Sequence, residues 1–237
     1  AVDLLPKVDC LYNVNQLIPY SQVDIQDMHV RIVSQVIHGA QTIRILQGEA
    51  VFMGILGGFI GKYIKHHMDI RKTKSDIIWA EMETPHEIKI ADKDMEKETT
   101  LSQSLSLVDL KIVTKLEQKI KLSIKPTTTL LLEGRLLNGV CPGIYSRLIE
   151  QGKIYSAKTV LTTDQQEVLD VVLEQAPFGL MFTIPQLEKL GIDTSQVEGI
   201  VRQVSTYLDK GVRYIGVDLE NQGGLLLSKN KLCYIEP

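Results

Sequence analysis

The stretch that says most about the fold runs from Glu49 to Lys74 and reads EAVFMGILGGFIGKYIKHHMDIRKTK. An apolar run with several glycines, Val51 to Ile60, leads directly into a cluster of basic residues. Positive charge beside apolar surface is typical of segments that contact an anionic partner, such as a phosphate backbone or a lipid surface. We therefore expect this segment to be the functional surface of the protein.

The candidate anion-contacting residues are the basic side chains of this segment and two of its glycines. They are Lys62, Lys65, His66, Arg71, Lys72, Lys74, Gly58 and Gly61. The spacing of Gly58 and Gly61 resembles the GxxG loop of KH RNA-binding modules, which implies a clamp on single-stranded nucleic acid. Alternatively, Phe52, Phe59 and Ile60 enter an anionic membrane surface beside the same cations. A buried helix with a solvated basic end is the third interpretation.

Composition places the chain among ordinary globular proteins. It has 237 residues, 44% hydrophobic and 23% charged, with a net charge of −3, so any attraction to a polyanion must be local. The three cysteines, Cys10, Cys141 and Cys233, form no CxxC pair and indicate a reducing intracellular compartment. No signal-peptide pattern opens the chain, and the longest apolar run is shorter than the roughly 20 residues of a membrane span.

Motifs that carry catalytic chemistry are absent from the sequence. It contains no GxSxG, no HExxH and no GxGxxG, and its histidines are not spaced to hold a metal. We therefore predict no catalytic residues, no metal site and no small-molecule cofactor. An enzyme whose site assembles from distant residues remains an alternative.

The fold prediction is α+β, with a strand-rich antiparallel domain over residues 1–158. Strands are expected at His29–Ile37 and Thr42–Leu46, joined by a hairpin turn at residues 38–41. From Ser104 to Leu137, apolar residues alternate with Lys, Ser and Thr, which predicts further antiparallel strands with one solvated face.

Residues 159–237 are predicted to form a small winged-helix-like domain. Thr163 begins a helix, two more helical segments follow, and the chain closes with a strand hairpin, an order similar to that of winged helix-turn-helix domains. This part contains six Lys and Arg residues against eleven Asp and Glu residues. Because a duplex binder needs cations for several phosphates, this domain is expected to dock protein instead of DNA.

Together these patterns predict a non-enzymatic binding or assembly protein. It would hold a nucleic-acid backbone through the basic segment, and a protein partner or another copy of itself through the acidic C-terminal domain. The main alternative is a structural assembly protein, like a viral matrix or coat subunit, that contacts anionic membrane or neighbouring subunits.

Overall fold

The computed structural model of the protein describes residues 1–103 and 107–237. The body contains the strands β1 (Val2–Asp3), β4 (Val51–Leu56), β5 (Lys74–Trp79), β8 (Thr129–Glu133), β9 (Lys158–Thr162), β10 (Gly179–Thr183), β11 (Tyr214–Asp218), β12 (Gly224–Ser228) and β13 (Lys231–Ile235). A separate lid contains β2 (Lys7–Val14), β3 (Asp27–Val33), β6 (His86–Asp92) and β7 (Lys97–Ser102). The helices are α1 (Gln35–Ile45), α2 (Gly58–Ile70), α3 (Leu110–Ser123), α4 (Gly143–Ile154), α5 (Gln166–Glu174), α6 (Ile184–Lys189) and α7 (Val197–Asp209), with a short 3-10 helix at Glu220–Gln222.

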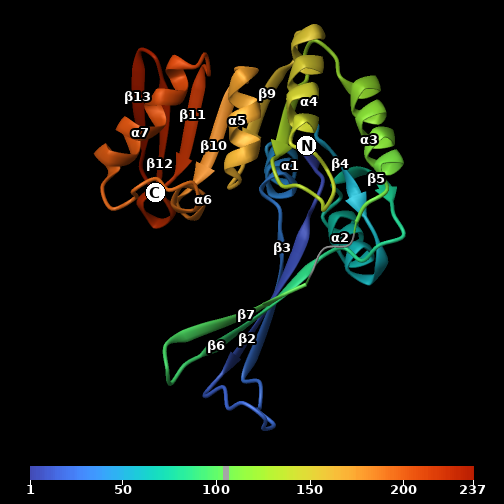
Figure 1. The fold of residues 1–237 in the computed structure, drawn as a ribbon, viewed down its shortest axis with the longest axis vertical. Coiled ribbons are helices and arrows are strands. Elements are labelled where there is room, and N and C mark those ends of the chain that lie inside the picture. Colours follow the sequence, from blue (N-terminus) through green and yellow to red (C-terminus); the bar gives the residue numbers. More distant parts are fainter. Residues whose placement is uncertain (104–106) are drawn as a thin grey trace.

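The body is built on one nine-stranded sheet with the order β13-β12-β11-β10-β9-β8-β1-β4-β5. The strands from β5 through β11 in this order pair in parallel, and β12 and β13 add an antiparallel edge. The four-stranded lid, with the order β3-β2-β6-β7, projects from one end of the body (Figure 1).

The stretch from Glu49 to Lys74 forms a parallel β-α-β unit made of β4, α2 and the start of β5. Side chains of β4 alternate between two cores: Met53 and Ile55 belong to one, and Phe52 and Leu56 to the other. A strand buried on both faces reads as a continuous apolar run, which is why this segment lacks visible alternation. Gly57 ends the strand where a Cβ atom would lie 2.0 Å from a backbone oxygen of Met82.

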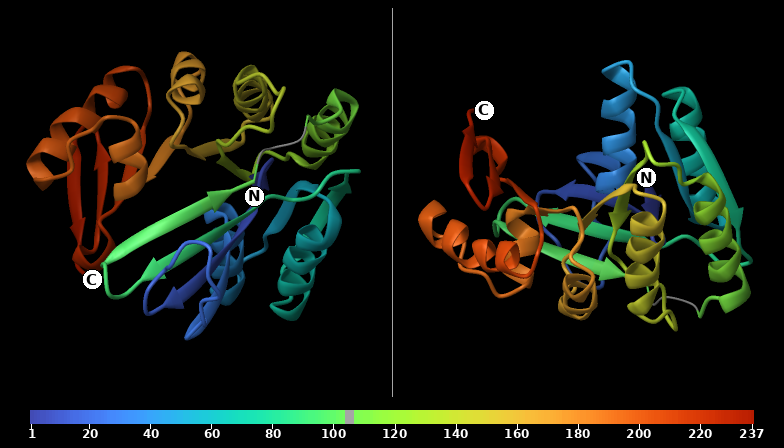
Figure 2. Two further views of the ribbon diagram at one scale, coloured as in Figure 1. Left: turned by 60° about the horizontal axis from the view of Figure 1, so that its bottom comes forward. Right: turned by 90° about the horizontal axis from the view of Figure 1, so that it is seen from above.

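Helices cover the body sheet in two layers, as the first view of Figure 2 shows. Helices α3, α4, α5 and α7 bury their apolar residues in the larger core on one face. Helices α1 and α2 pack against the opposite face over β1, β4, β5 and β8. The protein is therefore a mainly parallel α/β structure with helices on both sides.

The direction in which the chain crosses the sheet reverses between β1 and β8. From β1 the chain proceeds through α1 to β4 and β5, and after α3 it returns to β8 and continues through β9, β10 and β11. The carboxyl ends of strands beside such a reversal are the usual ligand-binding position in open α/β sheets. The lid grows from the same edge, because β2 follows β1 and β6 follows β5.

The prediction of a strand-rich antiparallel domain followed by a winged helix is wrong. Residues predicted as a second strand and its turn form α1, in which Val36, Ile37 and Ala40 are buried. Much of the alternating segment at 104–137 forms α3, where Val113, Leu116 and Ile120 face the core; residues 104–106 lie outside the described part. Strands that pair in parallel are far apart in the sequence, so their pairing leaves no local pattern. The alternation of apolar and polar residues therefore did not identify the strands correctly.

The C-terminal helices α5, α6 and α7 form near the positions predicted, but they do not form a winged helix. Strand β10 lies between α5 and α6 and pairs in parallel with β9 and β11. The hairpin predicted across residues 220–223 corresponds to the antiparallel pair of β11 and β12, and β13 adds one more strand at the edge of the large sheet. The boundary near residue 158 stays a prediction, while the sheet itself continues across it through the pairing of β8 with β9.

Within the described residues, no helix is long and apolar enough to cross a membrane. Two phenylalanines proposed as membrane contacts have opposite environments. Phe52 is fully buried and Phe59 is 76% exposed. Only Phe59 is positioned on the surface.

This pair gives a direct test of the packing. We expect Phe52→Ala to lower the free energy of unfolding by about 3–5 kcal/mol, because it removes an aromatic ring from a closed core and leaves a cavity. Phe59→Ala is the matched control on α2 and should change stability by less than about 0.5 kcal/mol. Urea unfolding of both variants measures the difference, and equal effects would contradict the assigned burial.

Candidate active site

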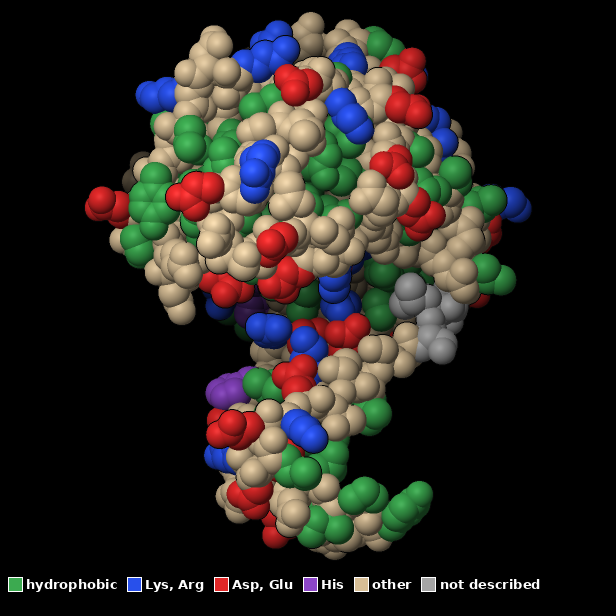
Figure 3. All heavy atoms as spheres, turned by 60° about the vertical axis from the view of Figure 1, so that its left-hand side comes forward, with side chains coloured by type: hydrophobic (Ala, Val, Ile, Leu, Met, Phe, Trp, Pro, Cys, Tyr) green, Lys and Arg blue, Asp and Glu red, His purple; other side chains and the backbone are tan. Residues whose placement is uncertain are grey.

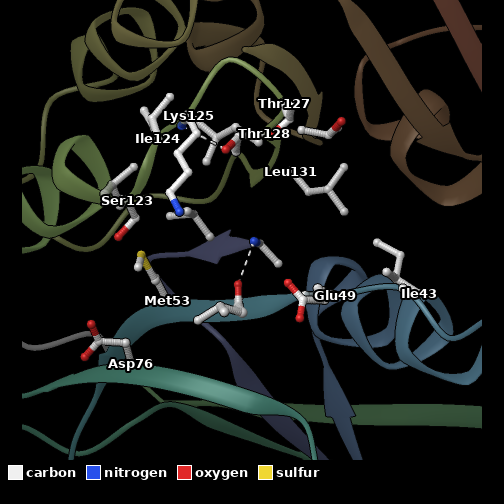
Figure 4. A pocket seen from close by; sticks show the side chains of 18 residues that line it. Ile43, Glu49, Met53, Asp76, Ser123, Ile124, Lys125, Thr127, Thr128 and Leu131 are labelled. Atoms are coloured by element: carbon white, nitrogen blue, oxygen red, sulfur yellow. Dashed lines mark hydrogen bonds between the residues drawn. The ribbon is translucent and has the colours of Figure 1, made fainter. Parts of the chain in front are cut away.

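Two cavities compete as the functional site, and they lie at opposite edges of the body sheet. The larger, about 880 Å³, is at the amino ends of β1, β4 and β8 and is lined by Glu49, Asp76, Lys125 and several threonines and apolar residues (Figure 4). The smaller, about 180 Å³, lies under the lid at the carboxyl edge. We take the smaller as the candidate site, because ligands of open parallel sheets bind beyond the carboxyl ends of the strands.

A buried guanidinium group occupies the point where the strand order reverses. Arg135 follows β8, and its Nη2 donates a 2.7 Å hydrogen bond to the backbone oxygen of Val33 at the end of β3. The same nitrogen lies 3.5 Å from the Asp3 carboxylate and 3.4 Å from that of Glu133. These acids end β1 and β8 and are almost completely buried. One guanidinium thus joins two central strands to the base of the lid.

Glu133 also caps the N-terminus of α1. Its carboxylate accepts hydrogen bonds from the backbone N–H groups of Gln35, at 2.8 Å, and Val36, at 3.3 Å. A negative group is favourable here because the N–H groups at a helix N-terminus have no partner within the helix. Even so, burial and the nearby Asp3 carboxylate raise the pKa of Glu133 to about 7, against the opposing effect of Arg135.

Polar side chains from neighbouring strands complete the wall beside α1. The hydroxyl of Thr162, at the end of β9, donates to the Gln35 side-chain oxygen at 2.7 Å and accepts from the Gln186 amide at 3.0 Å. Gly134 brings β8 close to β9, because a Cβ atom there would lie 2.8 Å from Thr163. The polar side chains at the carboxyl edge are therefore joined by hydrogen bonds, and the close packing of β8 against β9 fixes their positions.

The lid turns a charged face toward this edge. Strand register puts Lys7, Asp9, Arg31, Glu87 and Lys89 on one side of the lid sheet. They pair among themselves: Lys7 with Glu87 at 2.7 Å, and Asp9 with Arg31 at 3.2 Å and Lys89 at 3.0 Å. Figure 3 shows charged side chains gathered where the lid joins the body.

The cavity lies between this lid face and Arg135. Lys7, His86, Glu87 and Arg135 line it, together with Leu5, Pro85 and Gln103. Two buried side-chain atoms of this lining, Nε of Arg135 and Nδ1 of His86, have no hydrogen-bond partner. Buried polar atoms without a partner are uncommon, and at a cavity they are groups that a ligand can satisfy. The arrangement suits a small molecule with hydroxyl groups and negative charge.

The basic residues predicted from sequence lie elsewhere, on and after α2. Lys62, His66, Arg71, Lys72 and Lys74 are exposed, and Lys65 pairs with Asp69 on the same helix at 2.5 Å. Ile60 is partly buried against the core of α1 and α2. The structure does not bring these residues into the cavity under the lid.

The GxxG segment is the capped beginning of α2. The Glu83 carboxylate accepts hydrogen bonds from the backbone N–H groups of Phe59, at 3.1 Å, and Ile60, at 2.8 Å. The hydroxyl of Thr84 accepts from Gly57 at 2.9 Å, and Gly61 is buried beside Thr84. Because the chain's own side chains use these donors, the loop cannot clamp a nucleic-acid backbone as the KH resemblance implied.

The protein resembles known proteins in its three-dimensional structure but not in its sequence. No protein-family model and no curated protein sequence matches the chain. Among solved structures, phosphofructokinase-2 from Escherichia coli in complex with fructose-6-phosphate matches with a TM-score of 0.82 and 15% identity, covering 100% of this chain and 78% of that one. Ribokinase from Thermotoga maritima matches with a TM-score of 0.67 and 16% identity, covering 99% and 76%. The chain shares the fold of these sugar kinases.

A further match is the tetrameric inhibited form of the Escherichia coli phosphofructokinase-2, with a TM-score of 0.82 and 16% identity. These likenesses overturn the functional prediction made from sequence. The prediction of a non-enzymatic, nucleic-acid-binding or viral assembly protein is wrong, because the structural neighbours are kinases of small sugars. Nucleic acid and membrane are likewise not the partners that this fold indicates, and the alternative of an enzyme with a dispersed site agrees best.

Sequence reasoning missed every residue of the candidate site: Asp3, Lys7, Asp9, Arg31, Glu87, Lys89, Glu133 and Arg135. One signal was available. The apolar strand at Thr129–Glu133 ends in Glu133-Gly134-Arg135, and charged residues directly after a buried parallel strand mark its carboxyl end. The apolar run was assigned to an antiparallel sheet, in which that position has no special meaning.

The raised pKa of Glu133 predicts a specific pH dependence of stability. The folded protein keeps a proton on Glu133 that the unfolded chain releases, so stability should fall as pH rises from about 4.5 to about 7. Glu133→Gln should reduce this fall, because the amide does not titrate. Urea midpoints measured across this range, with the exposed Glu174→Gln as control, test the expectation. An unchanged profile in Glu133→Gln would contradict it.

Proposed function

We propose that this protein is an enzyme that binds a phosphorylated sugar beneath the lid and takes part in phosphoryl transfer. The observation that carries the proposal is the cavity at the carboxyl edge, lined by Lys7 and Arg135 and covered by a charged lid face. Phosphofructokinase-2, which shares the fold, is solved in complex with fructose-6-phosphate, and this supports the same substrate class.

The groups around the cavity are suited to the two parts of such a substrate. Arg135 and Lys7 offer cationic donors for a phosphate, and arginine matches phosphate oxygens with paired N–H groups. Asp9 does not line the cavity itself, but it lies on the same lid face as Lys7 and Glu87 and has a buried carboxylate oxygen without a partner, which can accept a hydrogen bond from a sugar hydroxyl. A carboxylate in that position can also take up a proton when the hydroxyl reacts.

The lid gives the site its water-excluding cover. It is a four-stranded sheet joined to the body at its base, so it can close over a bound ligand without losing its own hydrogen bonds. Exclusion of water strengthens each charge interaction in the cavity and favours transfer to the sugar over hydrolysis.

Calorimetric titration with fructose 6-phosphate tests the binding. Because hydrogen bonds to a charged group contribute about 1.5–3 kcal/mol, Arg135→Met and Lys7→Met should each weaken binding about 10- to 150-fold. Arg147→Met on the far surface of α4 is the matched control and should bind as the wild type. Circular dichroism shows whether each variant is folded, and Lys7→Met remains informative if removal of the buried Arg135 unfolds the chain.

Transfer is measured separately, with fructose 6-phosphate and the magnesium complex of ATP, by following release of ADP. We expect Asp9→Asn to lower the rate of ADP release at least tenfold. Absence of sugar-phosphate binding at millimolar concentration would contradict the proposed ligand class. Binding without ADP release would contradict the proposed reaction.

A further inference from the structure

The cavity under the lid and the buried charge cluster beneath it share one residue, Arg135. Its Nε atom has no hydrogen-bond partner and belongs to the cavity lining, so it is a group that an anionic ligand can satisfy. Its Nη2 atom lies 3.5 Å from the Asp3 carboxylate and 3.4 Å from the Glu133 carboxylate. A ligand in the cavity and the two buried acids therefore depend on the same positive charge.

The cluster carries more negative than positive charge when both of its acids are ionised. Asp3 and Glu133 supply two negative charges against the single charge of Arg135, and their side chains are 0% and 4% exposed. Burial raises the pKa of Asp3 as well as that of Glu133. An excess negative charge in the interior is unfavourable, so the cluster favours a proton on one of the acids.

The groups around the cluster do not correct this imbalance. The titratable and charged groups that face it are Tyr145 from α4, Asp164 from the segment after β9, and Lys7, His86 and Glu87 from the lid across the cavity. Burial raises the pKa of Tyr145 well above its usual value, so its hydroxyl stays neutral. Asp164 pairs with Lys189 at 2.7 Å. Lys7 pairs with Glu87 at 2.7 Å. Among the described residues, the only cation in contact with the two acids is the guanidinium group that also faces the cavity.

Glu133 can keep its place in the structure whether or not it carries a proton. Its Oε2 atom accepts both hydrogen bonds from the N-terminus of α1, from the N–H groups of Gln35 and Val36. The other oxygen, Oε1, faces Arg135 and is free to be protonated without breaking those bonds. The buried Oδ2 atom of Asp3 lies against the same Arg135 nitrogen and has no hydrogen-bond partner, so it can accept a bond from that proton.

A second anion at Arg135 makes the ionised state of Glu133 less favourable. Charges interact more strongly in a buried site than in water, and a nearby like charge favours the protonated form of a carboxyl group. Without ligand, burial and Asp3 already raise the pKa of Glu133 to about 7. A phosphate bound at Arg135 shifts it further upward, so near neutral pH the occupied site holds a proton that the empty site holds only part of the time.

We propose that binding of a sugar phosphate at Arg135 is coupled to the uptake of a proton by Glu133. The proton moves from water or buffer to Oε1 of Glu133, which leaves Asp3 and the phosphate to share the guanidinium group. The inference rests on the proposed function and says how pH regulates that site. Because the complex binds more protons than the free protein, affinity should fall as pH rises above about 7, by at most about tenfold per pH unit for one proton.

Calorimetric titration of the full chain with fructose 6-phosphate measures the proton uptake directly. Titrations at pH 7.5 in two buffers of different ionisation enthalpy give the number of protons exchanged per bound ligand. The ligand phosphate is already doubly ionised at this pH, since its second pKa is about 6, so a proton taken up goes to the protein. We expect net uptake, together with an affinity that falls at least about threefold between pH 7.0 and pH 8.5.

Glu133→Gln decides whether Glu133 is the group that takes up the proton. The amide has the size of the protonated acid and does not titrate, so the variant should lose the uptake. At pH 8 it should bind fructose 6-phosphate at least about threefold more tightly than the wild type, whereas structural damage weakens binding. The exposed Glu174→Gln on α5 is the matched control and should keep the uptake and affinity of the wild type.

The outcomes separate this inference from the proposed function. Binding without proton uptake would overturn the inference alone. So would uptake that persists in Glu133→Gln, because it would place the proton on another group of the cavity, such as His86. If circular dichroism shows that Glu133→Gln is unfolded, His86→Gln decides instead: uptake retained supports Glu133, and uptake lost overturns it. Absence of binding would overturn the proposed function, and this inference with it.

Discussion

The buried charge cluster around Arg135 is the interaction on which the arrangement of the molecule depends. Its guanidinium group contacts the end of β1 through Asp3, the end of β8 through Glu133, and the end of the lid through the Val33 carbonyl. Breaking a buried ion pair by removing one partner costs about 3–5 kcal/mol, because the remaining charge stays in the interior. The Tyr145 hydroxyl, within 2.7 Å of the Glu133 carbonyl oxygen, fixes the backbone that carries the cluster.

The same sheet forms the centre of the fold and positions the residues of the candidate site. A parallel sheet needs helices on both faces, and that requirement leaves its carboxyl edge as the place where loops and polar groups can gather. The chain places the acidic ends of two central strands there and then adds the lid above them. Arg135 contacts both of those acids, while the lid cations pair with the lid's own acids, Asp9 and Glu87.

Local pattern was enough to predict some elements, and it failed where long-range pairing decided the structure. The C-terminal helices show regular apolar spacing, and the hairpin of β11 and β12 has a polar turn at residues 220–223, so both were predicted near their true positions. At the end of α3, the alternation of Ile120, Leu122 and Ile124 suggested a strand, although Leu122 is 86% exposed while Ile120 is buried. The site was not predictable, because Asp3, Lys7 and Arg135 come together only after β1, the lid and β8 have assembled.

The lid strands come from separate parts of the chain, and this affects when the lid forms during folding. Strand β2 pairs with β3 nearby in sequence, but it also pairs in parallel with β6, so that Val8 lies beside His86. Between these strands the chain must pass through α1, β4, α2 and β5. Closing so long a loop costs entropy that is recovered only when the intervening unit has already packed. The lid should therefore be among the last parts to gain protection from hydrogen exchange during refolding, after the β4-α2-β5 unit.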